Sequence, residues 1–399
     1  MPSLLHEIDP DGDLIVVLKE ANTQKVIPDV YLPPRYGSES PDFVLDDTPV
    51  NASYIPSGLP CKEEGDDSPD VIRFRVSSRQ LMLNSEVFKK MLSGPWKESQ
   101  PIDPQHLSLQ EMHEGSYADS SSDSLSPDED RPSNRPLSHD PCIREISATG
   151  WNAHALLTVF RIIHGQCSEV RTWVNFEFFA HVANIANYYR CAGALSLAAY
   201  LWLGSSNEFH DLRQYQRHDG WEMGGDIQFK YGRQLIILLF ITWVFAIQED
   251  FKVATYSVVK GGHGLSYIKT YDLAIGELLS TLETKRWNAI HTLTSALSDM
   301  KGKMKRYELC CMSRKYIAAV IGLLELNFEE HPELTVENGN YDGLSLEGFI
   351  EKIQECGPGE LQYDMHLCSP KSLVKDTIRK VEEEIKRGHW SLLPLVNRD

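Results

Sequence analysis

A change in hydrophobic period at Ser77 constrains the fold of this chain more than any other feature. Before it, Ile72, Phe74 and Val76 alternate with two arginines, which is the period-two pattern of a strand with one buried face. After it, apolar residues recur every three or four positions, as on one face of a helix: Leu81, Leu83, Val87, Phe88, Met91 and Leu92. Residues 71–99 are therefore expected to run from a strand directly into helices.

A second helix start follows within the same stretch. Asn84 and Ser85 offer N-cap oxygens, and Glu86 places a carboxylate in the first turn, where it suits the helix dipole. The Ser-Gly-Pro sequence of residues 93–95 is expected to end this helix. Residues 96–99 then place a large aromatic side chain beside a carboxylate, either as a docking element or as the cover of their own helix end.

Acidic residues are concentrated in two segments of this 399-residue chain, whose formal net charge is -18. Residues 19–70 hold eleven Asp/Glu against four Lys/Arg, and residues 100–140 hold nine against two. Both segments are rich in proline and show no clear period, so we expect two disordered acidic insertions. The serines of the second make it either a solvated tether or a phosphorylation substrate. The net charge argues against nucleic-acid binding.

Targeting and redox signals indicate a nuclear or cytoplasmic protein. The opening residues, MPSLLHEIDPDGD, lack a basic start followed by an apolar core, so no secretory signal is expected. Eight cysteines without regular spacing then favour reduced thiols. The longest apolar run, residues 235–247, is too short to span a bilayer and predicts a buried core helix, so no membrane partner is expected.

The rest of the ordered sequence predicts two more strands and a series of helices. The strands are expected at residues 14–18 and 142–147, where β-branched or alternating apolar residues occur. Apolar spacing predicts helices over residues 151–164, 174–189, 192–203, 227–248, 274–283, 287–300, 307–326, 345–355 and 370–387. The last is the best delimited, because Ser369 can cap it, Pro370 suits its first position and Gly388 its end.

The order strand, gap, strand, two short helices, strand and further helices resembles the BTB/POZ fold, in particular the divergent BTB proteins of filamentous fungi. The resemblance is carried by four phrases: GDLIVVL from residue 12, FRVSSRQLMLNSEVFKKMLSGPWKES from residue 74, WNAHALLTVFRIIHGQ from residue 151 and NYYRC from residue 187. It implies an α+β chain with a BTB/POZ-like domain, a small sheet with a helical cluster, over residues 10–204 that contains both insertions. A polar linker at residues 205–225 and an all-α domain over residues 226–399 are expected to follow.

The same resemblance implies a protein-protein interaction module and no enzyme. BTB domains commonly homodimerise, and many are substrate adaptors of cullin-RING ubiquitin ligases. Cullin-binding members carry a hydrophobic-x-Glu motif just after a helix with an F-x-x-M pattern. Phe88 and Met91 form that pattern here, and Trp96 and Glu98 match the motif, so these four are the candidate partner-binding residues. The alternative is a non-ligase scaffold or a transcription-associated factor that assembles through the same domain.

Two features depart from the family pattern. Only a short stretch precedes the first expected strand, so the N-terminal helix that many dimeric members exchange is absent or very short, which weakens the expectation of a homo-oligomer. The acidic insertion before Val71 stands where the family usually has a tight connection.

A zinc site is the main chemical alternative. Cys356, His366 and Cys368 lie close in sequence, Cys310 could approach them, and thiolate and imidazole ligands suit zinc. Their spacing matches no standard finger pattern, so buried free thiols are the competing interpretation. Residues 261–264, Gly-Gly-His-Gly, lack the strand-then-helix context of a phosphate loop and predict an ordinary loop, so no cofactor is expected. The hydrolase and zinc-protease signatures are missing from the sequence, which favours a non-enzyme.

Overall fold

The computed structural model divides the chain into two compact units, and each is considered by itself. The first comprises residues 1–24, 56–171 and 185–195, and the second comprises residues 25–55, 172–184 and 196–399. The structure describes residues 4–33, 43–47, 71–94, 143–205, 229–306, 339–355 and 370–387, together with 318, 321–322, 325–326 and 329–330. Because the chain enters each unit more than once, these units differ from the single division at residue 204 that the sequence predicts.

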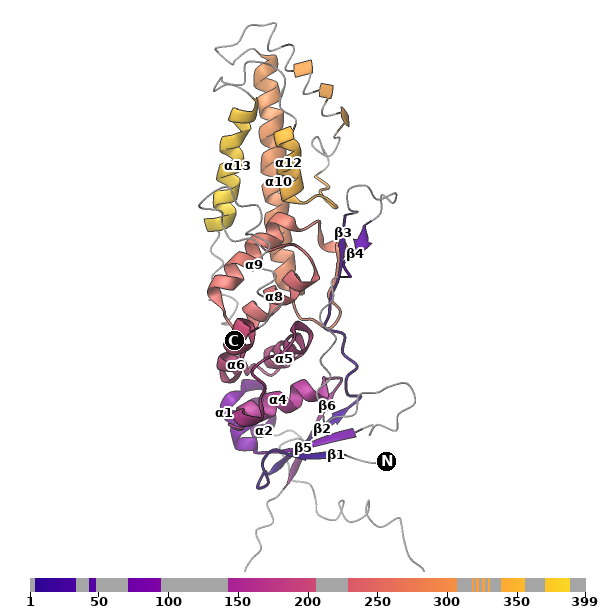
Figure 1. The fold of residues 1–399 in the computed structure, drawn as a ribbon, viewed down its shortest axis with the longest axis vertical. Coiled ribbons are helices and arrows are strands. Elements are labelled where there is room, and N and C mark those ends of the chain that lie inside the picture. Colours follow the sequence, from indigo (N-terminus) through magenta and orange to yellow (C-terminus); the bar gives the residue numbers. More distant parts are fainter. Residues whose placement is uncertain are drawn as a thin grey trace, which may run out of the picture. The chain divides into compact units, whose positions relative to one another are not determined.

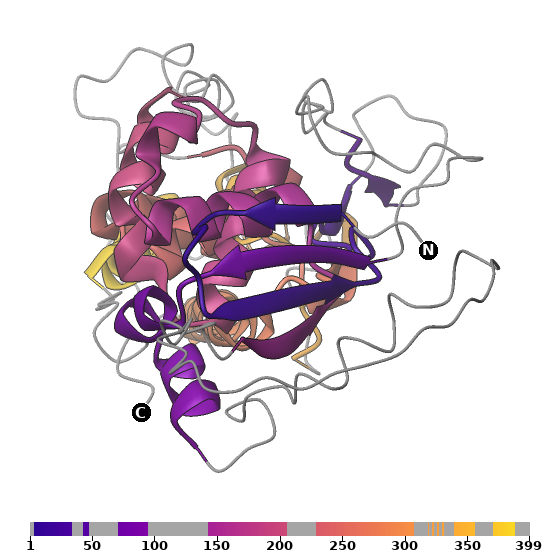
Figure 2. The ribbon, with the colours of Figure 1, turned by 90° about the horizontal axis from the view of Figure 1, so that it is seen from below.

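The first unit is built on a four-stranded sheet in the order β1-β5-β2-β6 (Figures 1 and 2). Its strands are β1 (Leu4–Glu7), β2 (Leu14–Lys19), β5 (Val71–Val76) and β6 (Arg144–Thr149). β2 and β5 pair antiparallel from Leu14 opposite Val76, and β6 lies parallel to β2. The three predicted strands are confirmed, whereas β1, which pairs parallel to β5, was not expected.

The alternation seen in the sequence decides which face of this sheet is buried. Ile72, Phe74 and Val76 are buried, and the two arginines between them are less so. β2 departs from strict alternation because Val17 is buried as well as its neighbours Val16 and Leu18. Burial on both faces is typical of a central strand, and β2 lies between β5 and β6.

Two short helices connect β5 to β6, as predicted. Ser77 caps α1 (Ser78–Asn84), since its hydroxyl accepts a hydrogen bond from the amide of Gln80. Ser85 caps α2 (Glu86–Ser93) through the amide of Phe88. The second cap is therefore Ser85, one of the two residues that the sequence offered for it.

Three longer helices follow β6: α4 (Ala153–Ile163), α5 (Phe176–Tyr188) and α6 (Ala192–Ser205). Asn152 caps α4 by accepting a hydrogen bond from the amide of Ala155 at 2.9 Å. The Phe160 ring of α4 meets the Phe74 ring of β5 edge to face, with ring centroids 5.6 Å apart. This contact places α4 against the buried face of the sheet.

Two strands of a second, three-stranded sheet lie within the segment that was expected to be disordered. β3 (Asp29–Leu32) pairs antiparallel with β4 (Val44–Leu45) and with β7 (Ile268–Lys269). The prediction of disorder over residues 19–70 is therefore wrong for the described residues 19–33 and 43–47. β3 pairs with a strand more than two hundred residues away, which composition does not indicate. Residues 100–140 lie outside the described residues.

The second unit begins its helical part with α8 (Arg233–Val244) and α9 (Gln248–Gly261). The predicted helix over residues 227–248 ends early, because Ala246 adopts a positive φ of 55° and turns the chain into α9. Asp46 accepts a hydrogen bond from the backbone amide of Arg233 at 2.7 Å, so β4 and its flank supply a cap for α8.

The predicted helices at residues 274–283 and 287–300 form one continuous helix, α10 (Gly276–Lys305), which is the longest ribbon in Figure 1. The two predicted helices left residues 284–286 between them. Arg286 is instead buried on the inner face, and its guanidinium donates to the Glu283 carboxylate one turn earlier. Pairing one turn apart satisfies both charges without interrupting the helix.

Two further helices complete the described part of the second unit: α12 (Leu346–Glu355) and α13 (Pro370–Arg387). Ile378, Val381 and Ile385 of α13 are buried, and their spacing of three and four residues places them on one face of the predicted helix. Most of residues 307–326 lie outside the described residues. The chain is thus a mixed α+β protein in which helices predominate.

Candidate functional site

Phe88, the first of the predicted partner-binding residues, lies in the core of the first unit. Its side chain is fully buried, and its ring is stacked on Tyr189 with centroids 4.3 Å apart and an interplanar angle of 8°. The Phe160 ring lies 6.4 Å away on a tilted plane. Phe88 therefore holds α2 in place from the core of the unit. None of its side chain is exposed to a partner.

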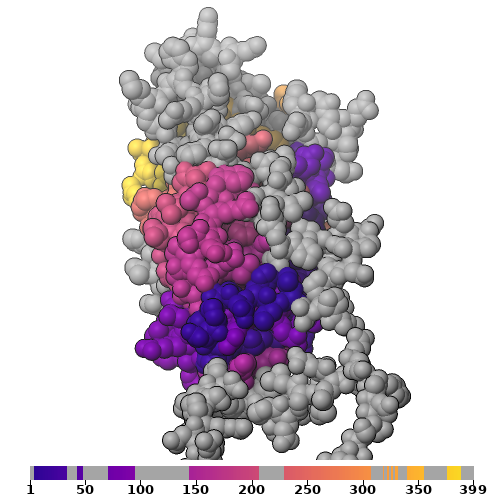
Figure 3. All heavy atoms as spheres, turned by 60° about the horizontal axis from the view of Figure 1, so that its bottom comes forward, coloured from indigo at the N-terminus to yellow at the C-terminus, as the bar shows by residue number. Residues whose placement is uncertain are grey.

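The outward side of α2 is chemically mixed. Lys89 and Lys90 are exposed, Val87 and Met91 are half-buried, and Leu83 of the neighbouring α1 is 71% exposed. Figure 3 shows residues 71–94 as violet spheres on the surface of the unit, beside the indigo N-terminal strands. Met91 is thus accessible in part. Trp96 and Glu98 lie outside the described residues, which end at Gly94 in this stretch.

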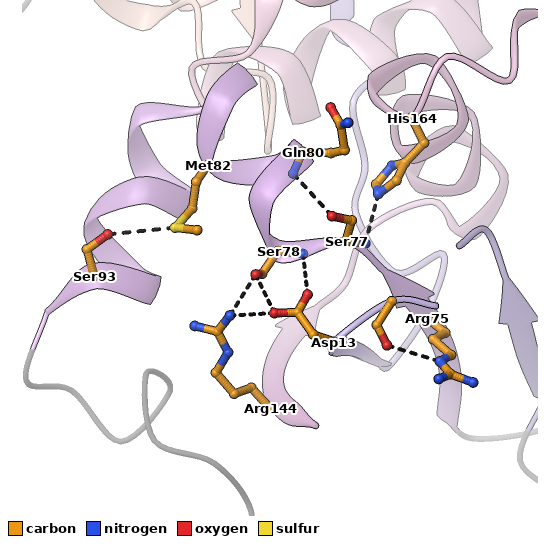
Figure 4. Close-up of polar contacts among 10 residues, drawn as sticks. Asp13, Arg75, Ser77, Ser78, Gln80, Met82, Ser93, Arg144 and His164 are labelled. Carbon is orange, nitrogen blue, oxygen red and sulfur yellow. Dashed lines mark hydrogen bonds and ion pairs between the residues drawn. The ribbon is translucent and has the colours of Figure 1, made fainter. Parts of the chain in front are cut away.

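A polar junction fastens the start of α1 to two strands (Figure 4). One carboxylate oxygen of Asp13 accepts the Ser78 amide at 2.8 Å, and the other accepts the Ser78 hydroxyl at 2.6 Å. Arg144 of β6 donates to the same carboxylate at 2.7 Å and to the Ser78 hydroxyl at 2.6 Å. The two phrases that begin at residues 12 and 74 are therefore in direct contact.

Hydrogen bonds keep the Asp13 carboxyl of this junction in its ionised form. Burial by itself raises the pKa of Asp13, but the hydrogen bonds from Ser78 and Arg144 outweigh burial and hold the pKa of this carboxyl below its ordinary value. Asp13 is consequently ionised at neutral pH, where it holds Arg144 and Ser78 together. The sequence gives no sign of this junction, since nothing local links Asp13 to residue 78 or 144.

Close approach of the backbone explains the glycine that precedes Asp13. A Cβ atom at Gly12 would lie 2.5 Å from the carbonyl oxygen of Val76. The Arg75 side chain donates to the Gly12 carbonyl at 3.1 Å (Figure 4). No side chain fits at position 12 without moving one of these strands.

His164 also belongs to this junction, because it binds the backbone amide of Ser77. Its Nε2 accepts a hydrogen bond from the amide of Ser77 at 2.9 Å (Figure 4). Its Nδ1 donates to the Phe160 carbonyl at 2.8 Å. A histidine that activates a serine must face the serine hydroxyl. Here the imidazole reaches an amide, and the Ser78 hydroxyl faces a carboxylate, so the geometry is that of a structural junction.

The Gly-Gly-His-Gly loop borders a small cavity in the second unit. This cavity of about 20 Å³ has room for about one water molecule. Its lining residues are Tyr231, Val258, Gly262, Gly264, Leu265, Ile268, Leu279, Leu282, Glu283 and Arg286. Residues 262–264 form a loop, as predicted, whereas Gly261 is the last residue of α9.

Arg286 is the central group of that cavity. Its guanidinium donates to both oxygens of Glu283 and to the carbonyl oxygens of Tyr341 and Leu344. The cationic side chain is only 2% exposed, which is tolerated because four acceptors surround it. It thereby ties the segment before α12 to the middle of α10.

Two further polar atoms at this loop are buried without a partner in the described part of the chain: the Tyr231 hydroxyl and Nδ1 of His263. Burial, followed by the nearby Arg286 charge, lowers the pKa of His263 to about 4. Burial also raises the pKa of Tyr231. Both side chains are therefore neutral near pH 7.

The candidate zinc ligands cannot be placed. Cys310, Cys356, His366 and Cys368 all lie outside the described residues. Within the ranges that the structure describes, no three or more His, Cys, Asp or Glu side chains gather in a way that could hold a metal ion.

No helix among the described residues is both long enough and apolar enough to cross a bilayer. Comparison with known proteins adds no relative: no family model, no curated protein and no solved structure matches this chain.

Proposed function

We propose that the first unit is a BTB/POZ-like protein-interaction domain, and that residues 88–98 dock it to a cullin scaffold as a substrate adaptor of a ubiquitin ligase. On this proposal the chain is not an enzyme, and it acts by bringing proteins together. Phe88 would be the internal support of the docking element, while Met91, Trp96 and Glu98 would provide the contacts.

The proposal rests above all on the Asp13–Ser78 contact. Two of the four phrases that carry the resemblance are separated by more than fifty residues, and this contact brings them together at the point where the strand β5 becomes the helix α1. The order of elements after that point, two short helices, a strand and then longer helices, is also the order on which the resemblance rests. Chance similarity of either phrase alone would not require the two to meet.

The surface of α2 supports a docking role in a second way. Its inner face is anchored by Phe88 and Leu92, so the residues that follow Gly94 leave a helix whose position is firmly held. A held helix reduces the ordering cost of binding. A tryptophan beside a single carboxylate is the composition that interface hot spots favour.

A pull-down of the cullin scaffold would test the proposal. Wild-type protein should recover the scaffold, and the double variant Trp96→Ala/Glu98→Ala should lose most of that recovery. Trp173→Ala, which removes a partly exposed tryptophan of the other unit, is the matched control and should behave like the wild type.

Equal recovery by the wild type and the double variant would overturn the role of Trp96 and Glu98. If neither protein recovers the scaffold, cullin docking as a whole is overturned. The scaffold or transcription-associated role is then the better interpretation of a BTB-like domain.

A further inference from the structure

Residues 43–47, Phe-Val-Leu-Asp-Asp, make their side-chain contacts with the second unit through two anchors three positions apart. Phe43 is half-buried and Asp46 is only 7% exposed. Val44 and Leu45 between them are 54% and 40% exposed. A strand with one face in a core buries alternate side chains. This segment instead leaves two adjacent apolar side chains in solvent, so its buried contacts are concentrated at the two anchors.

The first anchor is an aromatic ring in contact with two others. Phe43 is stacked on Tyr267, with ring centroids 4.0 Å apart and an interplanar angle of 27°. His263 meets the same ring edge to face at 5.5 Å. A Cβ atom added at Gly343 would lie 3.8 Å from the Phe43 ring, so the backbone at that glycine borders the ring as well. Because aromatic pairs add to the free energy of burial, this part of the second unit offers a site for one aromatic side chain.

The second anchor is the Asp46 carboxylate at the start of α8. Its Oδ2 atom accepts a hydrogen bond from the backbone amide of Arg233, the first residue of that helix, at 2.7 Å. The N-cap residue, Gly232, has no side chain with which to cap the helix, and a Cβ atom there would lie 2.6 Å from the Asp46 carboxylate. The helix start thus leaves an amide and the necessary space to a carboxylate from another part of the chain, which is the group that a helix N-terminus favours.

Backbone pairing with β3 joins the two anchors. β4, only two residues long, pairs antiparallel with β3 at the edge of the three-stranded sheet (Figure 1). The amide of Asp46 extends this pairing by donating to the Val30 carbonyl at 2.7 Å. Addition of an extended segment to a sheet edge is a common mode of peptide recognition, in which backbone bonds give affinity and side-chain anchors give specificity. All of these residues belong to the second unit.

We propose that β3, the start of α8 and the residues around Tyr267 form a peptide-docking site, and that residues 43–47 are its tethered occupant. A partner protein is expected to bind there through an extended segment with an aromatic residue at its first position and Asp or Glu at its fourth. The segment in place shows which chemistry fits: a ring for Tyr267, a carboxylate for the Arg233 amide, and two solvent-exposed residues between them. The proposal does not depend on cullin docking.

A tethered occupant protects the site from weak competitors. Residues 33–42 connect β3 to Phe43, and so short a connection gives the occupant a local concentration on the order of 1 mM. A free peptide that binds the empty site with a dissociation constant of about 10 µM would then bind the occupied site about a hundredfold more weakly. Removing the two anchors should therefore open the site to a free peptide.

Fluorescence anisotropy with a labelled peptide of residues 41–49, PDFVLDDTP, tests the proposal on the full chain. The double variant Phe43→Ala/Asp46→Ala should bind this peptide about tenfold or more tightly than the wild type, because its site lacks the tethered occupant. Asp47→Ala, which changes an exposed residue of the same segment, is the control and should bind like the wild type. A peptide with alanine in place of both anchors should bind neither protein.

The docking site itself has a separate test. Adding Tyr267→Ala to the double variant removes the ring on which the aromatic anchor stacks, so the affinity for the peptide should fall by about tenfold. Ser266→Ala, at an exposed neighbouring position, is the matched control and should leave the affinity unchanged. Circular dichroism shows whether each variant is folded. Should the double variant fail to fold, Phe43→Leu keeps an apolar side chain but loses the stacking, and it should bind the peptide more tightly than the wild type.

A folded double variant that binds the peptide no more tightly than the wild type would overturn the proposal. Binding that survives Tyr267→Ala, or the loss of both anchors from the peptide, would overturn it too. If Phe43→Leu takes the place of the double variant, an affinity equal to that of the wild type has the same meaning. The test is separate from that of cullin docking, since positions 96 and 98 lie outside this segment and either proposal can fail alone.

Discussion

The ring of Phe88 lies nearly parallel to that of Tyr189, with centroids 4.3 Å apart, so the phenylalanine of the F-x-x-M pattern is a core residue. The Ser85 hydroxyl that caps α2 also donates to the backbone carbonyl of Tyr189. Side-chain stacking and this hydrogen bond together fasten α2 to the residue that follows α5. Any docking surface on α2 thus depends on a buried contact that no partner touches.

Removing the Phe88 ring should destabilise the first unit strongly. Phe88→Ala deletes a fully buried ring and leaves a cavity against Tyr189 and Phe160, so the free energy of unfolding should fall by about 3–5 kcal/mol. Leu83→Ala, on the exposed face of α1, should change it by no more than about 0.5 kcal/mol. Urea denaturation followed by circular dichroism measures both, and similar losses for the two variants would contradict the burial of Phe88.

Neutralising Asp13 should loosen the junction between β2, α1 and β6. Asp13→Asn keeps the shape of the side chain but removes the charge that holds Arg144, and the loss should be about 1 kcal/mol because the pair is partly exposed. The pKa of Asp13 is lowered in the folded state, so its contribution is present near neutral pH and is lost as the pH falls through that lowered pKa.

The variant Asp13→Asn should therefore be less sensitive to acid than the wild type, even though it is less stable at pH 7. Asp11→Asn changes an exposed carboxylate two residues away and serves as the control. Thermal unfolding measured between neutral and acidic pH gives the comparison, and identical acid profiles for Asp13→Asn and wild type would contradict the prediction.

His181 should make the second unit sensitive to mild acid. Burial lowers the pKa of this α5 histidine to about 4, against a value near 6.5 in an unfolded chain. The unfolded state therefore binds the proton more readily, and stability is full above about pH 6.5 and declines toward pH 4. The decline attributable to His181 should be on the order of 2 kcal/mol.

His181→Gln cannot take up that proton, so its stability should vary less over this pH range than that of the wild type. Guanidinium denaturation at several pH values measures the slope. An unchanged slope would show that His181 is not the group responsible.

Arg286 should be essential to the second unit as one half of a buried ion pair. Arg286→Met leaves the Glu283 carboxylate and the Tyr341 and Leu344 carbonyls without their donor, at a cost of about 3–5 kcal/mol. Arg286→Lys should recover only part of this loss, because an ammonium cannot reproduce the planar set of donors.

The double variant Glu283→Gln/Arg286→Met removes both charges and should be more stable than Arg286→Met alone. Denaturation midpoints of the two variants provide the comparison. A double variant that is the less stable of the two would mean that the unpaired carboxylate is not the source of the loss.

Local features of the sequence predicted local structure well. The alternation around Phe74, the helical period after Ser77, the cap at Ser85 and the helix start at Pro370 each involve residues within a few positions of one another, and the structure confirms the corresponding strand and helices. The same reasoning missed β1 and α9 and divided α10 into two helices.

The tertiary structure alone decided which distant residues meet. β3 pairs with β7, Asp13 is linked to Ser78 and Arg144, and Arg286 is buried because carbonyls from residues 341 and 344 surround it. Periodicity and capping are determined by bonds within one or two turns of chain, so the sequence shows them directly. Burial depends on what the rest of the chain places nearby, and for that reason the sequence put Phe88 at a contact surface, whereas the fold put it in the core.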